Sequence, residues 1–409
     1  MRISKNSINL FLFIICLVFP TFNNYELSFS IWLVIAFVTL RINYSLNFLK
    51  YISVFILLLG MAFIVMLFND YVLYYILRDI TYMMKPILGL LIGYQLFRNN
   101  IKFPIQFLVY AGVVMAMVHL LQVGYGIVIE GARNVREIRE HGGYFNDFEV
   151  YILIFLIFNQ KFELNISKRK RMYFLIILGL SSFFYLARTN FIQFVIFFLA
   201  LKGFLVWNKR SAIVLGSTVL VTLLGYFAIY QYNPVRNGKG LDEFLYKIKM
   251  APGEAFSTKI NRDDWKKFND NYRSYENVRT IQQMTVNKSF LFGEGIGSQV
   301  DLKQKVYLGD MELRNISILH NGYMTVLLKT GIVGLLIYFY TVFFFFGKRN
   351  YTTSKLQNLH FLLVGTSVFL IMSNWVFMGL YNLLDTKSLL IGFLFAYQNQ
   401  LLKEENQNA

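Results

Sequence analysis

Cysteine, proline and histidine are scarce in this sequence. The 409 residues include one cysteine, Cys16, together with five prolines and four histidines. A lone cysteine excludes an intramolecular disulfide and a cysteine-based metal site. Charged residues are also few, at 15% of the chain, whereas 56% of the residues are apolar and 18% are aromatic. This composition is not that of a soluble globular domain of such a size, and it indicates a polytopic membrane protein.

Apolar runs long enough to cross the hydrocarbon core, which takes roughly 20 residues per helix, recur along almost the whole chain. We therefore expect an all-α membrane protein with about twelve transmembrane helices. The expected spans are 8–22, 27–40, 51–68, 80–97, 104–128, 148–163, 172–187, 190–207, 211–231, 321–346, 359–381 and 388–402. The first run follows a basic start, but no small-residue cleavage site comes after it, so we interpret it as a retained helix.

The net charge of +17 comes from an excess of lysines and arginines, and these residues are unevenly distributed between the two sides of the expected membrane. With the amino terminus inside, most of them fall in inner segments, and the densest cluster is 168–171 with Lys161 nearby. This is the positive-inside pattern, which places both termini in the cytoplasm. Because the basic excess follows the topology, nucleic acid is not expected as a partner.

One long hydrophilic stretch, 232–320, separates the ninth and tenth expected spans and by parity faces outward. The segment SYENVRTIQQMTVN predicts a helix on which Tyr275, Val278 and Ile281 share a face, so the stretch should form an ordered helical cap. The glycines of FGEGIGS do not fit G-x-G-x-x-G, which argues against a nucleotide-binding loop. We divide the chain into the first nine helices (1–231), the extracytoplasmic cap (232–320), and the last three helices with a cytoplasmic tail (321–409).

Cations on the outer side are informative, because a charge near mid-membrane costs ~3 kcal/mol or more. In the short outer segments they are Arg78, Lys85, Arg133, Arg136, Arg139, Arg188 and Lys387. Arg188, in YLARTNF, can bind a phosphate through two hydrogen bonds or extend to lipid headgroups. Arg133, Arg136 and Arg139 would lie on one side of a helix, and a solvated face is the alternative. Lys329 is either a lysine that extends to the interface or a cavity residue.

His320 lies where the hydrophilic stretch returns to the membrane. A neutral imidazole can take a proton from an attacking hydroxyl, since its ordinary pKa is ~6.5, and capping of the next helix is the alternative. Asn321 either orients that ring or caps the helix. Gly331 and Gly334 would let this helix approach a neighbour closely. No acidic cluster with metal-ligand spacing occurs in the short outer segments, so we expect neither a metal nor another cofactor.

These features resemble the O-antigen polymerase and O-antigen ligase superfamily, the Wzy and WaaL type membrane glycosyltransferases. The resemblance rests on the long outer loop between the ninth and tenth spans and on the segments LHNGYMTVLLKTGIVGLLIYF, YLARTNF and VRTIQQMTVNKSFLFGEGIGS. It implies a GT-C-like fold and a catalytic His320. It also implies that Arg188 and Arg279 bind the undecaprenyl diphosphate leaving group, and that Arg136 or Arg139 is a further substrate-binding arginine.

The resemblance implies a polysaccharide polymerase at the outer face of the bacterial plasma membrane. It would transfer glycan from undecaprenyl diphosphate to a lipid-linked repeat unit, with a chain-length regulator protein and membrane lipids as further partners. In this chemistry, arginines neutralise the departing phosphate and a histidine activates the acceptor hydroxyl. Glu130, Asp147 and Glu294 are accessory candidates.

Other functions remain open at this point. The nearest is a ligase, which would use the same donor but transfer glycan to lipid A core or to a protein. A lipid-linked oligosaccharide flippase or other transporter would show repeated halves and ionisable residues near mid-membrane. A non-catalytic scaffold protein would not need His320.

Overall fold

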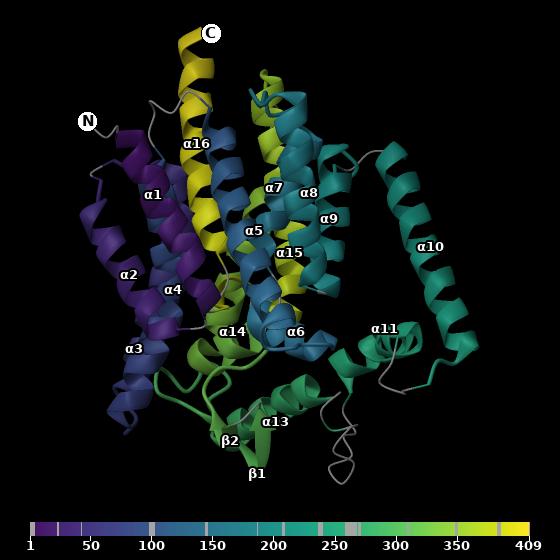
Figure 1. Cartoon of the computed structure of the whole chain (residues 1–409). Helices are drawn as coiled ribbons and strands as arrows, with labels where there is room; N and C mark the ends of the chain where they lie inside the picture. Colours follow the sequence, from purple (N-terminus) through teal and green to yellow (C-terminus); the bar gives the residue numbers. More distant parts are fainter. Residues whose placement is uncertain are drawn as a thin grey trace.

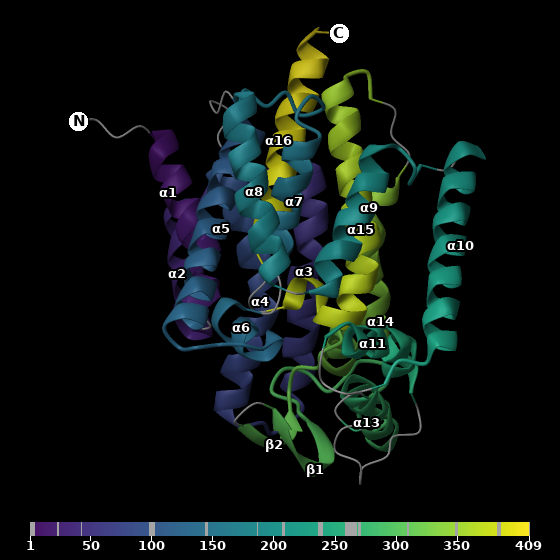
Figure 2. The ribbon, with the colours of Figure 1, turned by 45° about the vertical axis from the view of Figure 1, so that its right-hand side comes forward.

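The computed structural model shows a bundle of helices with a smaller group of elements across one end (Figures 1 and 2). The described residues are 5–22, 24–41, 43–97, 103–143, 146–185, 187–206, 209–235, 240–257, 268, 271–308, 311–347, 351–382 and 386–408. The first helix begins and the last helix ends at the opposite end of the bundle from these extra elements (Figure 1). We refer to the end that carries them as the capped end.

Each expected span overlaps a helix of the bundle. The helices are α1 (Lys5–Val18), α2 (Tyr25–Val38), α3 (Leu46–Met66), α4 (Leu73–Leu96), α5 (Pro104–Val128), α7 (Asp147–Ile157), α8 (Lys168–Phe184), α9 (Arg188–Leu201), α10 (Lys209–Tyr232), α14 (Gly322–Phe343), α15 (Ser354–Phe377) and α16 (Lys387–Asn408). Short 3-10 turns, η1 (Phe19–Phe22), η2 (Phe344–Phe346) and η3 (Gly379–Tyr381), extend α1, α14 and α15.

Length and hydropathy identify the helices best suited to cross a membrane. Within the described residues, five are long and apolar enough, namely α3, α5, α10, α15 and α14 with η2. The first helix with η1, α2 and α9 are apolar but shorter. This architecture agrees with the expected class, a helical membrane protein. The number of about twelve spans stays a prediction.

The capped end also contains a β-hairpin, which we did not expect in a helical cap. The helices of the capped end are α6 (Val135–Gly142), α11 (Gly240–Phe256) and α13 (Tyr272–Val286). The hairpin consists of the antiparallel strands β1 (Val300–Leu308) and β2 (Met311–Ile316). The signal for the hairpin was an alternation of apolar residues, since Val300, Leu302 and Val306 are buried along β1. These residues pack with α13 against the first turns of α14.

α14 is broken at Gly331, where φ is 68° and ψ is −170°. The break frees backbone groups that cannot be hydrated inside a membrane, so each needs a partner within the protein. The segment 290–298, which we call the glycine turn, supplies these partners. The Glu294 N–H donates to the Leu328 carbonyl at 2.7 Å, and the Ile332 N–H donates to a carbonyl of the turn at 2.9 Å.

The glycines of α14 do allow close approach, as the sequence predicted. A Cβ on Gly331 would lie 2.2 Å from the Leu291 carbonyl oxygen, which belongs to the glycine turn. A Cβ on Gly334 would lie 3.2 Å from the side chain of Leu58 on α3. The neighbour at the tighter of these two contacts is the glycine turn, and the neighbour at the other is the helix α3.

The variant Gly331→Ala tests this junction. Alanine at a positive φ costs about 1–3 kcal/mol, and its Cβ would also clash with the glycine turn. We expect a thermal unfolding midpoint several degrees below that of the wild type, measured by intrinsic fluorescence in detergent. The matched control is Gly225→Ala on α10, where a new Cβ meets nothing within 4 Å. Equal midpoints for Gly331→Ala and the wild type would contradict the described break.

Candidate functional site

His320 and Glu276 form a hydrogen-bonded pair between the loop before α14 and the helix α13. The Glu276 carboxylate accepts from the His320 backbone N–H at 2.9 Å and lies 3.0 Å from Nδ1 of the ring. The Glu276 side chain is 1% exposed, whereas that of His320 is 42% exposed. A carboxylate at Nδ1 favours the tautomer with its proton on that nitrogen, so Nε2 keeps the lone pair of a base.

The buried face of α13 is partly polar. The helix predicted for this stretch is present as α13. Of the three residues expected to share a face, Tyr275 is buried, Val278 is half-buried and Ile281 is 44% exposed. The buried residues are Tyr272, Ser274, Tyr275, Glu276, Thr280 and Met284. The Tyr272 ring lies edge-on to His320, with the ring centroids 5.7 Å apart. Burial, followed by the charge of Glu276, raises the pKa of Tyr272, so its hydroxyl stays protonated beside the pair.

The residues on either side of His320 are fixed by the start of α14. Asn321 is the N-cap of that helix, because its side chain accepts from the Met324 backbone N–H at 3.2 Å. Asn321 therefore takes the capping role that the sequence left open. The Thr325 hydroxyl accepts from the Leu319 backbone N–H at 3.2 Å. These two contacts fix the backbone that carries the imidazole.

Arg78 of α4 contacts the same loop. Its guanidinium donates to the Ser317 hydroxyl, three residues before His320. It also lies over the Tyr75 ring, 5.0 Å from the centroid. The Arg78 Nε–H is buried and donates to no described hydrogen-bond acceptor. Arg78 thus brings a positive charge to the His320 loop, although the sequence marked it only as one of several outer cations.

Lys329 forms a buried ion pair with Asp79 of α4, with its Nζ 2.5 Å from the carboxylate. The same ammonium donates to the Ser298 carbonyl at 2.6 Å, and the Gly297 N–H donates to Asp79 at 2.7 Å. Both residues of the pair are 1% exposed. Lys329 is therefore a cavity-lining residue, and not a lysine that extends to the interface. The pair joins α4, α14 and the glycine turn.

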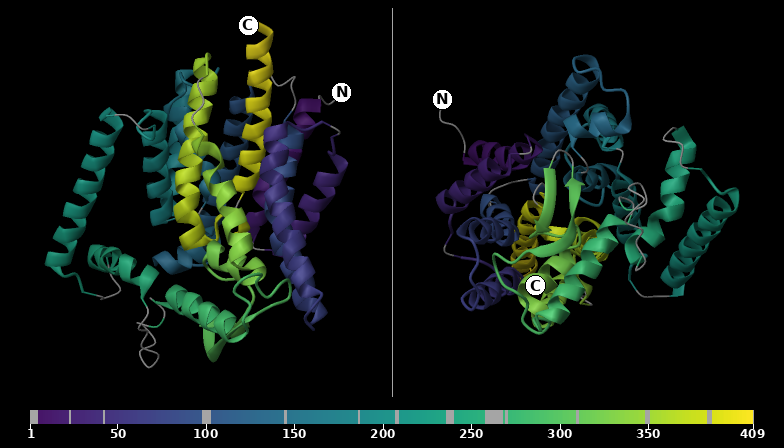
Figure 3. Two further views of the ribbon diagram at one scale, coloured as in Figure 1. Left: turned by 180° about the vertical axis from the view of Figure 1, so that it is seen from behind. Right: turned by 90° about the horizontal axis from the view of Figure 1, so that it is seen from below.

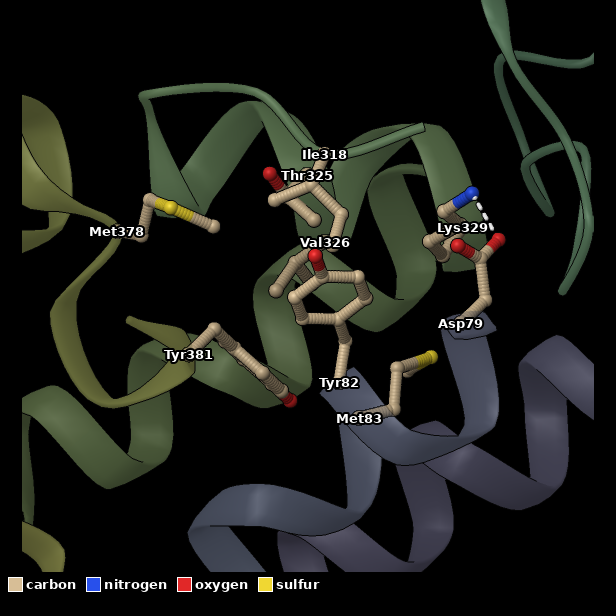
Figure 4. Close-up of a pocket in the computed structure, with 9 residues that line it drawn as sticks. All are labelled: Asp79, Tyr82, Met83, Ile318, Thr325, Val326, Lys329, Met378 and Tyr381. Carbon is tan, nitrogen blue, oxygen red and sulfur yellow. Dashed lines mark hydrogen bonds and ion pairs between the residues drawn. The ribbon is translucent and has the colours of Figure 1, made fainter. Parts of the chain in front are cut away.

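The cavity that Lys329 lines is small (Figure 4). It lies between α4, the loop before α14, α14 itself and η3, and its lining includes Tyr82, Thr325 and Tyr381. Its volume of about 10 Å³ holds about one water molecule. A sugar-sized ligand does not fit there, so a ligand of that size has to approach His320 from its exposed side.

Arg279 and Arg188 lie at the capped end in different surroundings. Arg279 is one turn after Glu276 on α13, and its guanidinium donates twice to the Asp301 carbonyl, at 3.2 and 3.3 Å. Arg188 is the first residue of α9, is exposed, and donates to the Lys247 carbonyl of α11 at 3.0 Å. Neither arginine forms an ion pair with a described residue. A hydrogen bond from Arg314 lowers the pKa of Asp301 below its usual range.

α6 contains the two remaining arginines predicted for the site. It begins after Asn134, whose side chain forms a capping box with Glu137. Arg133 therefore precedes the helix, and only Arg136 and Arg139 of the expected row lie in it. The Arg139 side chain is half-buried. That of Arg136 lies outside the described residues.

The three accessory acids contact other parts of the fold. Asp147 forms a buried ion pair with Lys387 at 2.5 Å. Glu294 accepts a hydrogen bond from the Gln283 side-chain amide at 2.7 Å, and Glu130 accepts one from a tyrosine of α5 at 2.9 Å. Within the described part of the chain, no three His, Cys, Asp or Glu side chains are grouped as a metal site.

Sequence reasoning missed Glu276 and Asp79. Glu276 precedes its partner His320 by 44 positions, and Asp79 precedes Lys329 by 250. One signal was available, because a lysine inside a membrane span requires a buried acid as its partner. No local pattern in the sequence singles out Glu276 from the other acids of the cap.

Comparison with known proteins gives one match. Residues 173–339 match a family model described as O-antigen ligase. The matched range runs from α8 into α14 and contains His320, Asn321, Arg188 and Arg279. No curated protein and no solved structure matches the chain.

The Asp79–Lys329 pair can be tested with single and double variants. Asp79→Asn leaves the ammonium buried without its counter-charge, and removing one partner of a buried pair costs about 3–5 kcal/mol. We expect a large loss of thermal stability in detergent. The double variant Asp79→Leu with Lys329→Met removes both charges and should lose clearly less. If the double variant is the less stable of the two, the ion pair does not have the role described here.

Proposed function

We propose that the protein is a polysaccharide polymerase of the O-antigen ligase and polymerase superfamily. The match of residues 173–339 to the O-antigen ligase family model supports this proposal. The protein transfers a glycan of the O-antigen, capsule or exopolysaccharide type from undecaprenyl diphosphate to a lipid-linked repeat unit. In this proposal the chain crosses the bacterial plasma membrane about twelve times, with both termini in the cytoplasm and the capped end at the outer face, as the positive-inside pattern predicts. The family match supports an enzyme of the glycosyltransferase type that acts on lipid-linked glycans.

The observation that carries the proposal is the His320–Glu276 pair. Nε2 of His320 removes the proton of the acceptor hydroxyl as its oxygen attacks the anomeric carbon of the donor sugar. The new glycosidic C–O bond forms while the bond from that carbon to the diphosphate oxygen breaks, and the diphosphate leaves with the electron pair. The buried Glu276 carboxylate stabilises the imidazolium that results, as the acid of a catalytic triad does.

The leaving diphosphate needs positive charge, and the arginines of the capped end supply it. Arg279 is one turn from Glu276 on the same helix and now binds neutral carbonyl oxygen. Hydrogen bonds to a charged phosphate are roughly twice as strong as those to a neutral acceptor. A diphosphate therefore displaces the Asp301 carbonyl from this guanidinium. We assign the same role to Arg188, and Arg136 or Arg139 is a third contributor.

A ligase is the second candidate, because the matching family model is described as O-antigen ligase. The donor, the base and the arginines are the same in both reactions. Only the acceptor differs, since a ligase transfers the finished glycan to lipid A core or to a protein. Acceptor choice depends on the surface around His320, where the hairpin β1–β2 and α13 present polar side chains.

The first test is the length distribution of surface glycan in a deletion strain complemented with wild type, His320→Ala or Glu276→Gln. At equal membrane abundance, wild type should restore a ladder on a gel, and His320→Ala should leave a single repeat unit. Loss of the orienting acid of a triad lowers turnover by about 10⁴-fold in a serine protease, so Glu276→Gln should also abolish long chains. The control is Glu312→Gln, an exposed acid of β2 that pairs with Lys305.

The same gel separates the alternatives. Polymer that accumulates on the lipid carrier in the deletion strain, with none at the surface, identifies a ligase. Ladders of wild-type length from both variants would show that the site is not at His320. A further variant, Arg279→Ala, reports on the leaving group, and its ladder should shorten without any loss of folded protein.

A further inference from the structure

Arg78 is a cation beside His320 to which the proposed reaction gives no role. It belongs to α4 and is half-buried, and its guanidinium donates to the Ser317 hydroxyl in the loop that leads to His320. It forms no ion pair with a described residue, and its Nε–H has no described acceptor. A charge that is partly removed from water, with a neutral hydroxyl as its partner, favours the binding of an anion.

The acids of the site already have partners. Asp79 follows Arg78 on α4 and forms the buried ion pair with Lys329, and Glu276 binds His320. Consecutive residues of a helix do not face each other, so Asp79 and Arg78 leave α4 in different directions. An anion for Arg78 therefore has to come from a ligand, as far as the described residues are concerned.

Two tyrosines of α4 lie beside this guanidinium. Its carbon atom Cζ is 5.0 Å from the centroid of the Tyr75 ring and 5.7 Å from that of the Tyr74 ring. Tyr74 is 64% exposed. The face of an aromatic ring can pack against the apolar C–H face of a sugar, and a guanidinium can bind a charged substituent of the same sugar. These three side chains therefore have the composition of a site for an acidic sugar.

Arg78 and Arg279 belong to different walls of the site. Among the described elements, α4 packs on α2, α3 and α16, whereas α13 packs on α11, α14 and β1. Seen from the capped end, α4 and α13 lie on different sides of the hairpin (Figure 3, right). When the new glycosidic bond forms as the bond to the leaving group breaks, the attacking and leaving oxygens are on opposite faces of the sugar ring. With the diphosphate at Arg279, the acceptor therefore lies on the side of α4.

We infer that Arg78 is a specificity-determining residue, which binds the carboxylate of an acidic sugar in the acceptor glycan. The repeat unit of the polymer then contains such a sugar. The planar guanidinium donates to both carboxylate oxygens, and the rings of Tyr74 and Tyr75 pack against the sugar. This inference rests on the proposed function, because it names the chemical class of the acceptor in that reaction.

The diphosphates of the two substrates are the other anions of the reaction, and both lie away from Arg78. The leaving diphosphate is on the side of α13, opposite the attacking oxygen. The diphosphate of a lipid-linked acceptor is attached to the reducing end of its repeat unit, whereas the attacking hydroxyl is at the non-reducing end. A carboxylate on the attacking sugar or on the sugar next to it is therefore the anion that reaches α4.

The composition of the polymer gives the simplest test. Surface polymer from the deletion strain complemented with wild type is hydrolysed, and its sugars are identified by chromatography and mass spectrometry. We expect a sugar with a carboxylate in each repeat unit. A polymer whose sugars carry no carboxylate would overturn the inference and would leave the roles of His320 and Glu276 untouched.

Elongation by purified protein in detergent measures the preference itself. The substrates are lipid-linked repeat units, either native or with their carboxylates reduced to hydroxymethyl groups by carbodiimide and borohydride. We expect wild type to elongate the native units about tenfold faster, because a hydrogen bond to a charged group contributes about this factor. Arg78→Gln should elongate both substrates at one low rate.

Two control variants separate recognition from support of the loop. The Arg169 guanidinium also lies over a tyrosine, 5.9 Å from the Tyr173 centroid, but at the start of α8, so Arg169→Gln should keep the wild-type preference. Ser317→Ala removes the hydrogen bond to the loop while the guanidinium remains, and it should also keep the preference. An unchanged preference in Arg78→Gln, or its loss in Ser317→Ala as well, would overturn the inference.

Binding distinguishes a failure of this inference from a failure of the proposed function. His320→Ala should bind radiolabelled native repeat units more tightly than reduced ones, since Arg78 is intact, and the additional change Arg78→Gln should make the two affinities equal. If wild type elongates neither substrate, the polymerase proposal is wrong. Equal binding of the two substrates by His320→Ala would contradict the role of Arg78.

Discussion

A helix that breaks inside a membrane has to satisfy its freed backbone groups, and the structure depends on how α14 meets this requirement. The glycine turn donates to and accepts from the backbone on both sides of Gly331. Asp79 and Lys329 then bind the turn through Gly297 and Ser298. Unpaired, each of these charges would cost several kcal/mol or more in such a place. Paired, they fix α4, α14 and the turn in one arrangement.

This arrangement determines where His320 lies. The imidazole is borne by the last loop residue before the α14 N-cap, Asn321, so its position follows that of the first turns of the helix. The glycine turn leads from α13 to the hairpin and is anchored in the break, which brings Glu276 on α13 to the same end of α14. The carboxylate and the imidazole thus meet because two segments distant in sequence are bound to one broken helix.

The sequence predicted the local features of this fold well and the distant pairings poorly. Hydropathy located every helix of the bundle, because a span has to be apolar over its own length. The position of His320 at the start of a helix, and the possible role of Asn321 as the N-cap of that helix, could be predicted from the adjoining residues. The acids Glu276 and Asp79 could not, since the energy that selects them comes from partners elsewhere in the chain. The helix α13 could be predicted from its own residues, whereas the polar side chains on its buried side could not, because their partners lie elsewhere in the chain.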